Sequence, residues 1–461
     1  MARSHAASAV QSVRNEPATE RLAAYAAALR FEQLPAVAIE RAKHCLIDAI
    51  ACAIFGQRFP WSAIVLDEAL ATGAGGPCRL PGVPDKRLHV PQAALALGTF
   101  SHAFELDSLR KPGTGVHAGA TVALPAFAMA QAQGASGREL IAAIVAGVEV
   151  MFRIGNATLH TPEHIGFHAP GLTGPFGAAA ACGSLLRLSA SEIANAFGIA
   201  GSLAGGLLAF AKAGSGGMIK RLHLGRAAEG GVLAARLAQR GYEGPRTVLE
   251  GRYGVLEAFC EEHDTTLLTK GLGEIYEIER VCIKRYACHV TAQAPVELMR
   301  KFIEQQNFGG DDIRELAIEG SAKVLSHHSD ADPADVMLAQ YSVPFSVARA
   351  AYFDPNDPTV FSDRTLADGR VRALARRIGM STSARTKGWS TRMTLTLNDG
   401  RVLEGTSDAF LGCPEMPMLP AHLRMKFDAL TQSGSDRLKQ SLFDDLMQLE
   451  RLSSLDQLAL A

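Results

Sequence analysis

The sequence lacks several features that mark common classes of protein. Its 461 residues carry a formal net charge of −1, so no positive excess indicates binding to nucleic acid or to a membrane surface. Apolar runs such as 49–55 and 203–210 are far shorter than the roughly 20 residues that span a bilayer. Residues 1–20 are polar and contain no apolar stretch of the secretory-signal type. These absences favour a cytoplasmic protein with no membrane or nucleic-acid partner.

The usual cofactor and metal motifs are also missing. The eight cysteines include no C-x-x-C pair, which argues against an iron–sulfur cluster or structural zinc and favours reduced thiols. Cys45 and Cys52 fit one predicted helix as small core residues. His327 and His328 have no third ligand at metal spacing, so no metal site is predicted. There is no Walker A loop, dinucleotide fingerprint or G-x-S-x-G elbow, and side chains alone are expected to do any chemistry.

The first part of the chain has a helical pattern. A length of 461 residues exceeds the roughly 250–300 at which single cores stop growing, so we expect two domains. Ser136 with Glu139, and Ser189 with Glu192, have the spacing of helix-capping boxes. Apolar residues recur at helical spacing in six runs, at 91–103, 120–133, 137–156, 176–188, 190–205 and 223–239.

The pattern changes near residue 270. Strands are predicted at 274–283 and 313–318, and 392–397 with 401–404 flank Asn398-Asp399-Gly400, a hairpin turn. Helices are predicted at 335–352, 363–378, 420–430 and 435–452. The prediction is a mainly α protein with an α+β second domain. A helical domain of residues 1–269 is joined by an α+β domain, 270–404, and by C-terminal helices, 405–461, that return to the first domain, with a cleft between the two domains.

One segment combines glycine with positive charge. Gly214-Ser-Gly-Gly precedes Lys220, Arg221 and His223, and a helix-like run follows. Glycines allow close backbone approach to a ligand, and a helix N-terminus favours negative charge. The segment therefore suits a multiply charged anion. The alternative is a helix N-terminus with a solvated basic edge.

Two further segments offer acid/base groups. In HAFELD (102–107) the carboxylates of Glu105 and Asp107 would point to different helix faces, so at most one enters a site with ease; His117 follows after a polar loop. The alternative is a charged helix end with a loop histidine. His168 lies in a Gly/Pro-rich segment, 166–177, read as a loop before a helix. Its ordinary pKa suits general acid/base work, although a histidine bonded to a backbone carbonyl fits equally well.

The second domain adds cations and a phenol. KRYACH (284–289) follows a predicted strand and contains Lys284 and His289, which could project into the cleft. The alternative is a solvated pair of Lys284 and Arg285 with His289 as a capping histidine. Tyr341 could donate a hydrogen bond to an oxyanion, although a core tyrosine is more common. Together these groups form a metal-free acid/base set in a basic pocket, which fits proton removal alpha to a carboxylate. Dehydration, decarboxylation and epimerisation are the outcomes left open.

Seven ordered blocks resemble the MmgE/PrpD family, whose members include 2-methylcitrate dehydratases, cis-aconitate decarboxylases and iminodisuccinate epimerases. The blocks are CLIDAIACAIFG (45–56), HAFELD (102–107), GFHAPGLTGPFGAAAA (166–181), GGMIKRLHLGRAAEGG (216–231), KRYACH (284–289), AQYSVPF (339–345) and GCPEMPM (412–418). The resemblance implies a large helical domain built from both chain ends plus a smaller α+β lid, a homodimer and no organic cofactor.

The resemblance also implies roles for the candidate residues. Asp107, His117, His168 and Tyr341 would be catalytic, and substrate would be bound by Glu105, Lys220, Arg221, His223, Lys284 and His289. The leading hypothesis is a hydro-lyase of the 2-methylcitrate dehydratase type, in propionate metabolism, acting on a small di- or tricarboxylate. Decarboxylation, epimerisation and a catalytically silent carboxylate binder are the alternatives. Glu105 and Ser108-Leu109 depart from the dehydratase spelling H-A-x-D-F-D-D-T where specificity should be set.

Overall fold

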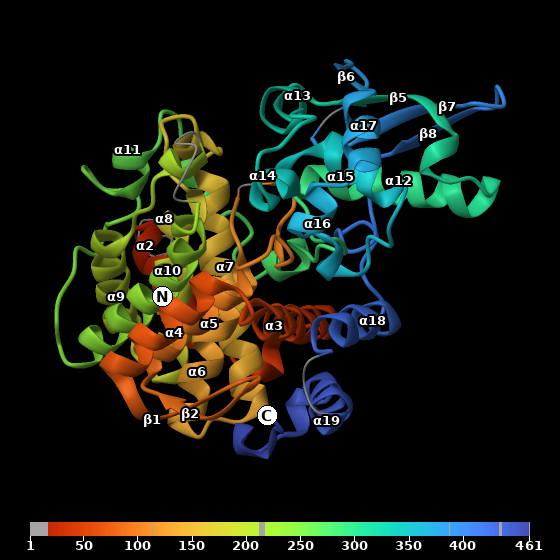
Figure 1. Cartoon of the computed structure of the whole chain (residues 1–461). Coiled ribbons are helices and arrows are strands. Elements are labelled where there is room, and N and C mark those ends of the chain that lie inside the picture. Colours follow the sequence, from red (N-terminus) through yellow and green to blue (C-terminus); the bar gives the residue numbers. More distant parts are fainter. Residues whose placement is uncertain (1–16, 114, 212–216, 387, 433–435, 461) are drawn as a thin grey trace. The chain divides into compact units, whose positions relative to one another are not determined.

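The computed structural model describes residues 17–460 except 114, 212–216, 387 and 433–435, and it divides into two compact units (Figure 1). The first unit takes in the described parts of Met1–Ala103, Ser108–Val281 and Ser433–Ala461. The second consists of Phe104–Asp107 and Cys282–Gln432. The chain thus enters the second unit briefly at residues 104–107, the last four residues of the HAFELD block.

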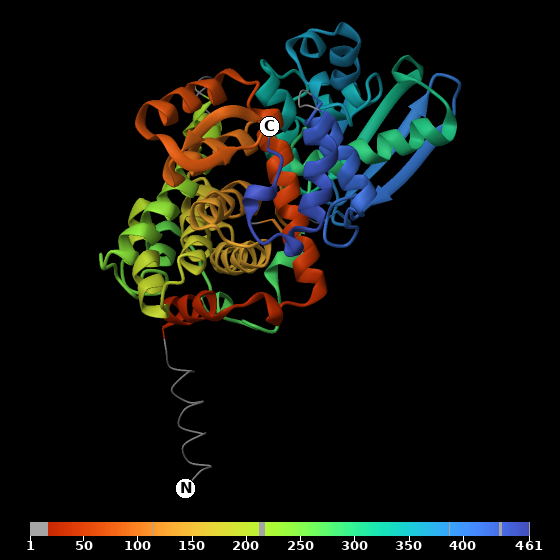
Figure 2. The same ribbon diagram turned by 90° about the horizontal axis from the view of Figure 1, so that it is seen from below.

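The first unit is almost entirely helical. In the described residues its helices are α2 (Ala18–Ala28), α3 (Ala36–Gly56), α4 (Pro60–Gly73), α5 (Val90–Ser101), α6 (Leu124–Gln133), α7 (Gly137–Ala157), α8 (Ala169–Leu185), α9 (Ala190–Leu203), α10 (Ile219–Gln239), α11 (Val255–Phe259) and α19 (Asp436–Met447). Strands β1 (Ala74–Leu80) and β2 (Val83–Leu88) pair antiparallel, and β3 is Leu109–Arg110. In Figure 2 the dark blue α19 lies beside α3, so both chain ends contribute to this unit.

Small residues let the central helices approach closely. A Cβ at Gly225 of α10 would lie 2.2 Å from Oγ1 of Thr99 in α5, and one at Gly231 would lie 2.3 Å from the Cβ of Ala178 in α8. Since no side chain fits at either point, α10 packs directly against α5 and α8. This packing places the N-terminus of α10, the N-terminus of α8 and the C-terminus of α5 near one another.

The second unit is α+β. Its helices are α12 (Val290–Gln306), α13 (Ala322–His328), α14 (Val336–Tyr341), α15 (Val343–Ala350), α16 (Asp363–Leu366), α17 (Gly369–Arg376) and α18 (Pro420–Leu430). The sheet has the order β6-β5-β7-β8, from β5 (Ile313–Gly320), β6 (Ile378–Thr382), β7 (Thr391–Leu397) and β8 (Val402–Ser407). Strand β5 is parallel to β6 and antiparallel to β7, and β7 pairs with β8 as the predicted hairpin, with Leu395 opposite Leu403. Helix α12 packs on β7 and β8. The predicted class, mainly α with an α+β second part, is confirmed.

One helix has the length and composition of a membrane span. In the described chain α7 passes that test, yet 94% of its most apolar window is buried inside the protein. Helices α3 and α4 pass only as a pair, and they are bent by 98°. A core helix of a globular unit has the same properties as α7.

Four local predictions are wrong. Residues 274–283, predicted as one strand, contain a 3₁₀ turn, Glu277–Arg280, and the two-residue strand β4 (Val281–Cys282). The predicted alternation of buried and exposed residues took Glu277 as exposed, but Glu277 is buried by its ion pair with Arg110. The helix predicted at 335–352 breaks at Ser342, whose hydroxyl accepts from the N–H of Phe345 and starts a new helix. The helix predicted at 363–378 breaks at residues 367–368 and ends at Arg376, and Ile378 starts β6. Most of the predicted loop 166–177 is helical, since α8 begins at Ala169.

Candidate functional site

The basic segment lies in the first turn of α10. Residues 214–216 of the predicted glycine cradle lie outside the described residues, whereas Lys220 and Arg221 are within α10 and 4% and 1% exposed. The alternative of a solvated basic edge is therefore wrong. Arg221 donates from Nη1 to the backbone oxygen of His102, at 3.1 Å, which satisfies a carbonyl at the end of α5.

Four histidines gather around this helix end. His168 is the N-cap of α8, and its Nδ1 lies 3.1 Å from Nδ1 of His223. The ring centroids of His102 and His117 are 4.8 Å apart, and those of His102 and His168 are 6.3 Å apart. The cluster therefore joins side chains from α5, α8, α10 and the segment before the π-helical turn Gly119–Ala123.

Burial and positive charge lower the pKa values of two of these histidines, His168 and His223. Burial lowers the pKa of His168 well below its usual range, and Lys220 and the neighbouring histidines lower it further. The pKa of His223 is lowered by burial and then by Lys220. Both rings are therefore expected to be neutral at neutral pH. An anion placed beside them would reverse the effect and favour their protonated forms.

A pocket gives ligands access to His223. It encloses about 880 Å³ including open solvent, and its lining includes Gly206, Phe210, Ile219, His223 and Arg226. At Gly206, with φ +131°, a side chain would be strained, and its Cβ would lie 3.2 Å from Nδ1 of His223. Glycine at this position therefore leaves room for the histidine ring.

The second unit holds a buried lysine between two carboxylates. Nζ of Lys284 lies 3.2 Å from Oε2 of Glu105 and 3.9 Å from Oδ1 of Asp107, and all three side chains are at most 2% exposed. Burial lowers the pKa of Lys284, but Glu105 and Asp107 outweigh it, so the net shift is upward. The lysine is therefore held in its charged form.

Both carboxylates reach Lys284 because the chain is not helical here. The prediction that at most one would enter a site rested on a helix through residue 107, and it is wrong. Helix α5 ends at Ser101, and Glu105 has φ +56°, a conformation that costs free energy for a residue with a side chain. This turn redirects the backbone so that Glu105 and Asp107 converge.

Two glutamines hold the lysine loop in place. Nε2 of Gln340 donates to the backbone oxygens of Phe104 and Ala287, each at 3.0 Å, so one amide ties the two segments of the lysine cluster together. Oε1 of Gln293 accepts from the N–H groups of Arg285 and Tyr286, at 3.0 and 3.1 Å. Neither glutamine was predicted as a site residue, since an amide that binds backbone has no spacing signature.

The rings of His289 and Tyr341 both lie close to the ring of His328. His289 is the N-cap of α12 and its Nδ1 lies 2.9 Å from Oγ1 of Thr291, so the expected capping role is real. Its ring stacks on His328 with centroids 4.1 Å apart, and the centroids of His289 and Tyr341 are 5.1 Å apart. Nδ1 of His328 lies 3.1 Å from the backbone oxygen of Tyr341 and must carry the proton of that hydrogen bond.

Known families match both units. Residues 20–268 match the MmgE/PrpD N-terminal domain, and residues 286–448 match the MmgE/PrpD C-terminal domain. The chain belongs to the MmgE/PrpD family. It is 30% identical to cis-aconitate decarboxylase of Aspergillus terreus (strain NIH 2624) over 470 residues, which cover 95% of this chain and 94% of the relative.

Two further relatives carry related names. The cis-aconitate decarboxylase-like protein oryM of Aspergillus oryzae is 32% identical over 334 residues, 67% of each chain. Human cis-aconitate decarboxylase is 28% identical over 282 residues, which cover 59% of this chain and 57% of the relative. These names support a lyase of the MmgE/PrpD family. They lend no support to 2-methylcitrate dehydration or to propionate metabolism.

The structure groups the predicted MmgE/PrpD site residues into two sets. The first unit brings together His117, His168, Lys220, Arg221 and His223, and the second brings together Glu105, Asp107, Lys284, His289 and Tyr341. Two histidines were missed as site residues. His102 is the first residue of HAFELD, in which only the two carboxylates were considered as site residues. His328 follows His327, and this pair was considered only as a possible metal site. His102 lies within a recognised block, whereas no recognised block includes His328.

Proposed function

We propose that this MmgE/PrpD protein is a cofactor-free carboxy-lyase for a small tricarboxylate of the cis-aconitate type. The observation that carries the proposal is the pair of the buried His168 and the half-buried His223, close to Lys220. A cationic environment suits a trianionic substrate, and the histidine pair supplies a proton-transfer group. The full-length likeness to a relative named cis-aconitate decarboxylase supports the same reaction.

The reaction requires one proton and one leaving carboxylate. The bond from the methylene carbon to its carboxylate breaks, and its electron pair forms a new terminal double bond. The original double bond gives its electrons to a new C–H bond on the vinylic carbon, and CO₂ leaves. One proton is therefore consumed for each substrate converted to a 2-methylene dicarboxylate.

The histidine pair is suited to deliver that proton. In the absence of substrate, burial and Lys220 keep both rings neutral. A bound trianion raises their pKa values, because opposite charge favours the protonated form. Substrate binding thus favours protonation of the histidine pair, which then donates this proton to the vinylic carbon. The charge of Lys220 acts on both histidine rings, and we therefore assign the first contact with a substrate carboxylate to Lys220.

The lysine cluster is assigned a proton-holding role. Glu105 and Asp107 outnumber Lys284, so the three groups together carry one formal negative charge. Such a group binds a further carboxylate poorly, and we therefore propose that Lys284 keeps its proton between the two carboxylates and does not bind the substrate anion. His289 and Tyr341 remain proposed contacts for the substrate.

Dehydration is the second candidate. The observation in its favour is that His168 is neutral in the resting protein, which is the state of a general base. A base would remove the proton alpha to a carboxylate while a β-hydroxyl leaves. We also propose that the protein is cytoplasmic and forms a homodimer. Light scattering of the purified protein tests the dimer.

Proton NMR in D₂O separates these reactions. The protein is incubated with cis-aconitate, citrate, 2-methylcitrate and iminodisuccinate in turn. New methylene signals with CO₂ release from cis-aconitate support decarboxylation, and vinylic signals from a hydroxy acid indicate dehydration. Deuterium exchange without net product indicates epimerisation. No change with any compound, together with stabilisation by citrate that Lys220→Met removes, would show a silent binder.

A further inference from the structure

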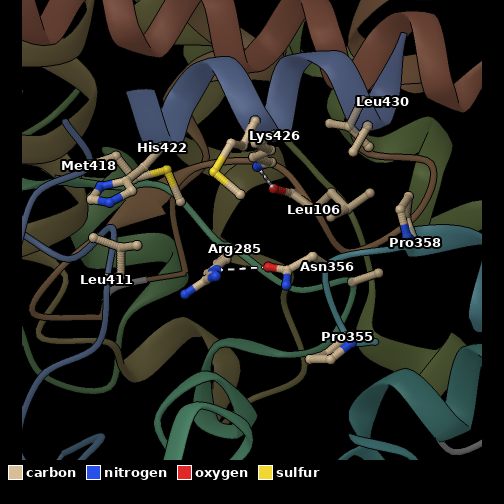
Figure 3. A pocket seen from close by; sticks show the side chains of 13 residues that line it. Leu106, Arg285, Pro355, Asn356, Pro358, Leu411, Met418, His422, Lys426 and Leu430 are labelled. Atoms are coloured by element: carbon tan, nitrogen blue, oxygen red, sulfur yellow. Dashed lines mark hydrogen bonds between the residues drawn. The ribbon is translucent and has the colours of Figure 1, made fainter. Parts of the chain in front are cut away.

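A second pocket lies behind Leu106, the residue between Glu105 and Asp107 (Figure 3). It belongs to the second unit and encloses about 540 Å³, counting its open mouth. Helix α18, the loop at 355–358 and the segment after Lys284 supply its walls. Much of the surface is apolar, from Leu106, Leu411, Met418, Met425 and Leu430. None of the described residues that line it is acidic.

Three nitrogen donors face this apolar lining. Arg285 donates from Nε to Oδ1 of Asn356 at 2.8 Å, and no described residue accepts a hydrogen bond from its two terminal nitrogens. Figure 3 shows this pair across the pocket from Lys426, whose Nζ donates to the backbone oxygen of Leu106 at 2.8 Å. His422 accepts the N–H of Leu419 at Nδ1, so its neutral ring carries the proton on Nε2 as a donor.

Three acids close in sequence or contact to these walls are already engaged in hydrogen bonds. Oε2 of Glu297 accepts from the N–H of Leu411 at 3.1 Å. Oδ1 of Asp354 accepts from the side-chain amide of Asn356 at 2.8 Å, and Oδ1 of Asp357 accepts from the N–H of Thr359 at 2.9 Å. None of these three acids lines the pocket. The pocket therefore offers cationic donors and apolar walls without a competing carboxylate.

We propose that this pocket binds a monocarboxylate with a short apolar body, such as a medium-chain fatty acid. A guanidinium with two uncommitted terminal nitrogens is the preferred partner of a carboxylate. The guanidinium of Arg285 matches a single carboxylate, while the leucines and methionines bury the hydrocarbon. A tricarboxylate would leave charged groups against those apolar walls. The ligand class thus differs from that of the proposed substrate.

Calorimetry on the full-length protein tests this assignment with three probes. Hexanoate has both the charge and the chain, hexan-1-ol has the chain alone, and acetate has the charge alone. Hexanoate should bind about tenfold or more tightly than either of the others, because the charged hydrogen bonds and the apolar burial each contribute. Equal affinity for hexanoate and hexan-1-ol would overturn the proposal.

Matched variants locate the binding. Arg285→Met should weaken hexanoate about tenfold or more, while Arg424→Met on α18, whose guanidinium binds Asp428 away from the pocket, should not. Ala429→Phe fills the pocket and should abolish binding in a protein that keeps its thermal transition. Lys220→Met should leave hexanoate binding unchanged whether or not the protein is a lyase. Loss in Lys220→Met, or normal binding in Ala429→Phe, contradicts the assignment.

Discussion

The Nδ1 atoms of His168 and His223 lie 3.1 Å apart in the first unit. One ring must donate and the other must accept, so a single proton lies between them when both are neutral. The ring that donates this bond carries its proton on Nδ1, and the ring that accepts it carries its proton on Nε2. The pair is therefore a two-ring unit for proton transfer and is expected to titrate as a unit.

Substitution of His223 tests this unit. In His223→Asn the side-chain amide occupies the position of Nδ1 and can keep the bond to His168, whereas in His223→Gln it lies further out. We expect His223→Gln to lower kcat by about 10²-fold or more, the range of general acid–base catalysis, and His223→Asn to lose less. The kcat–pH profile of CO₂ release is the measurement. Equal losses with an unmoved profile would exclude a shared proton.

The cluster of Glu105 and Lys284 makes a prediction about stability. Lys284→Met leaves two buried carboxylates without their cation, which should lower the free energy of unfolding by about 3–5 kcal/mol. The double variant Lys284→Met with Glu105→Leu should lose less than the sum of the single variants, because it removes the unpaired charge as well. Urea denaturation of the four proteins measures this coupling.

A surface pair is the control for that cycle. Arg392 and Glu404 are also 3.2 Å apart, on adjacent strands, but their side chains are 32% and 57% exposed. Their coupling should be about 0–1 kcal/mol, the usual range for exposed ion pairs. A buried coupling no larger than the surface one would show that the Lys284 cluster does not depend on its charges.

Local signals predicted much of the fold. The hydroxyls of Ser136 and Ser189 accept from the N–H groups of Glu139 and Glu192, as the two capping boxes required. Asn398-Asp399-Gly400 connects β7 to β8 as predicted. Each of these features depends on residues close in sequence. Contacts within a few residues are therefore what sequence patterns predict best.

Long-range pairing explains what the sequence pattern missed. Glu277 is buried through Arg110, 167 residues away, and Glu105 reaches Lys284 across 179 residues. A charged residue is read as exposed when its partner is that distant. The family resemblance indicated that both Glu105 and Lys284 are site residues. Their mutual contact depends on the positive φ of Glu105, which no sequence pattern indicated.

Buried histidines should make the protein sensitive to mild acid. Burial lowers the pKa of His44 and of His328 to about 4, against roughly 6.5 in an unfolded chain. Between those values the unfolded state binds protons that the folded state does not. The free energy of unfolding therefore falls as pH drops below about 6.5, by about 1.4 kcal/mol per pH unit for each histidine, and levels off below about 4.

Urea denaturation between pH 7 and pH 5 measures this slope. His44→Leu removes one titrating group together with two buried ring nitrogens that no described residue satisfies, so its slope should be shallower. His328→Asn keeps a donor for the Tyr341 carbonyl and should be shallower by a similar amount. An unchanged slope in both variants would show that these rings are not the groups that take up protons on unfolding.

The contact of α10 with its neighbours makes the last prediction. Gly225→Ala would place a Cβ 2.2 Å from Oγ1 of Thr99 and 2.4 Å from the backbone oxygen of Leu95, so α5 and α10 must move apart. The expected loss is about 1–3 kcal/mol of unfolding free energy, as for overpacked cores. Gly230→Ala is the control on the same helix, since its Cβ meets nothing closer than 3.6 Å, and it should be neutral or stabilising by about 0.4–1 kcal/mol. Because α10 carries both Lys220 and His223, Gly225→Ala should also lower kcat, and Gly230→Ala should not. Equal stability of the two variants would mean that α10 does not pack directly on α5.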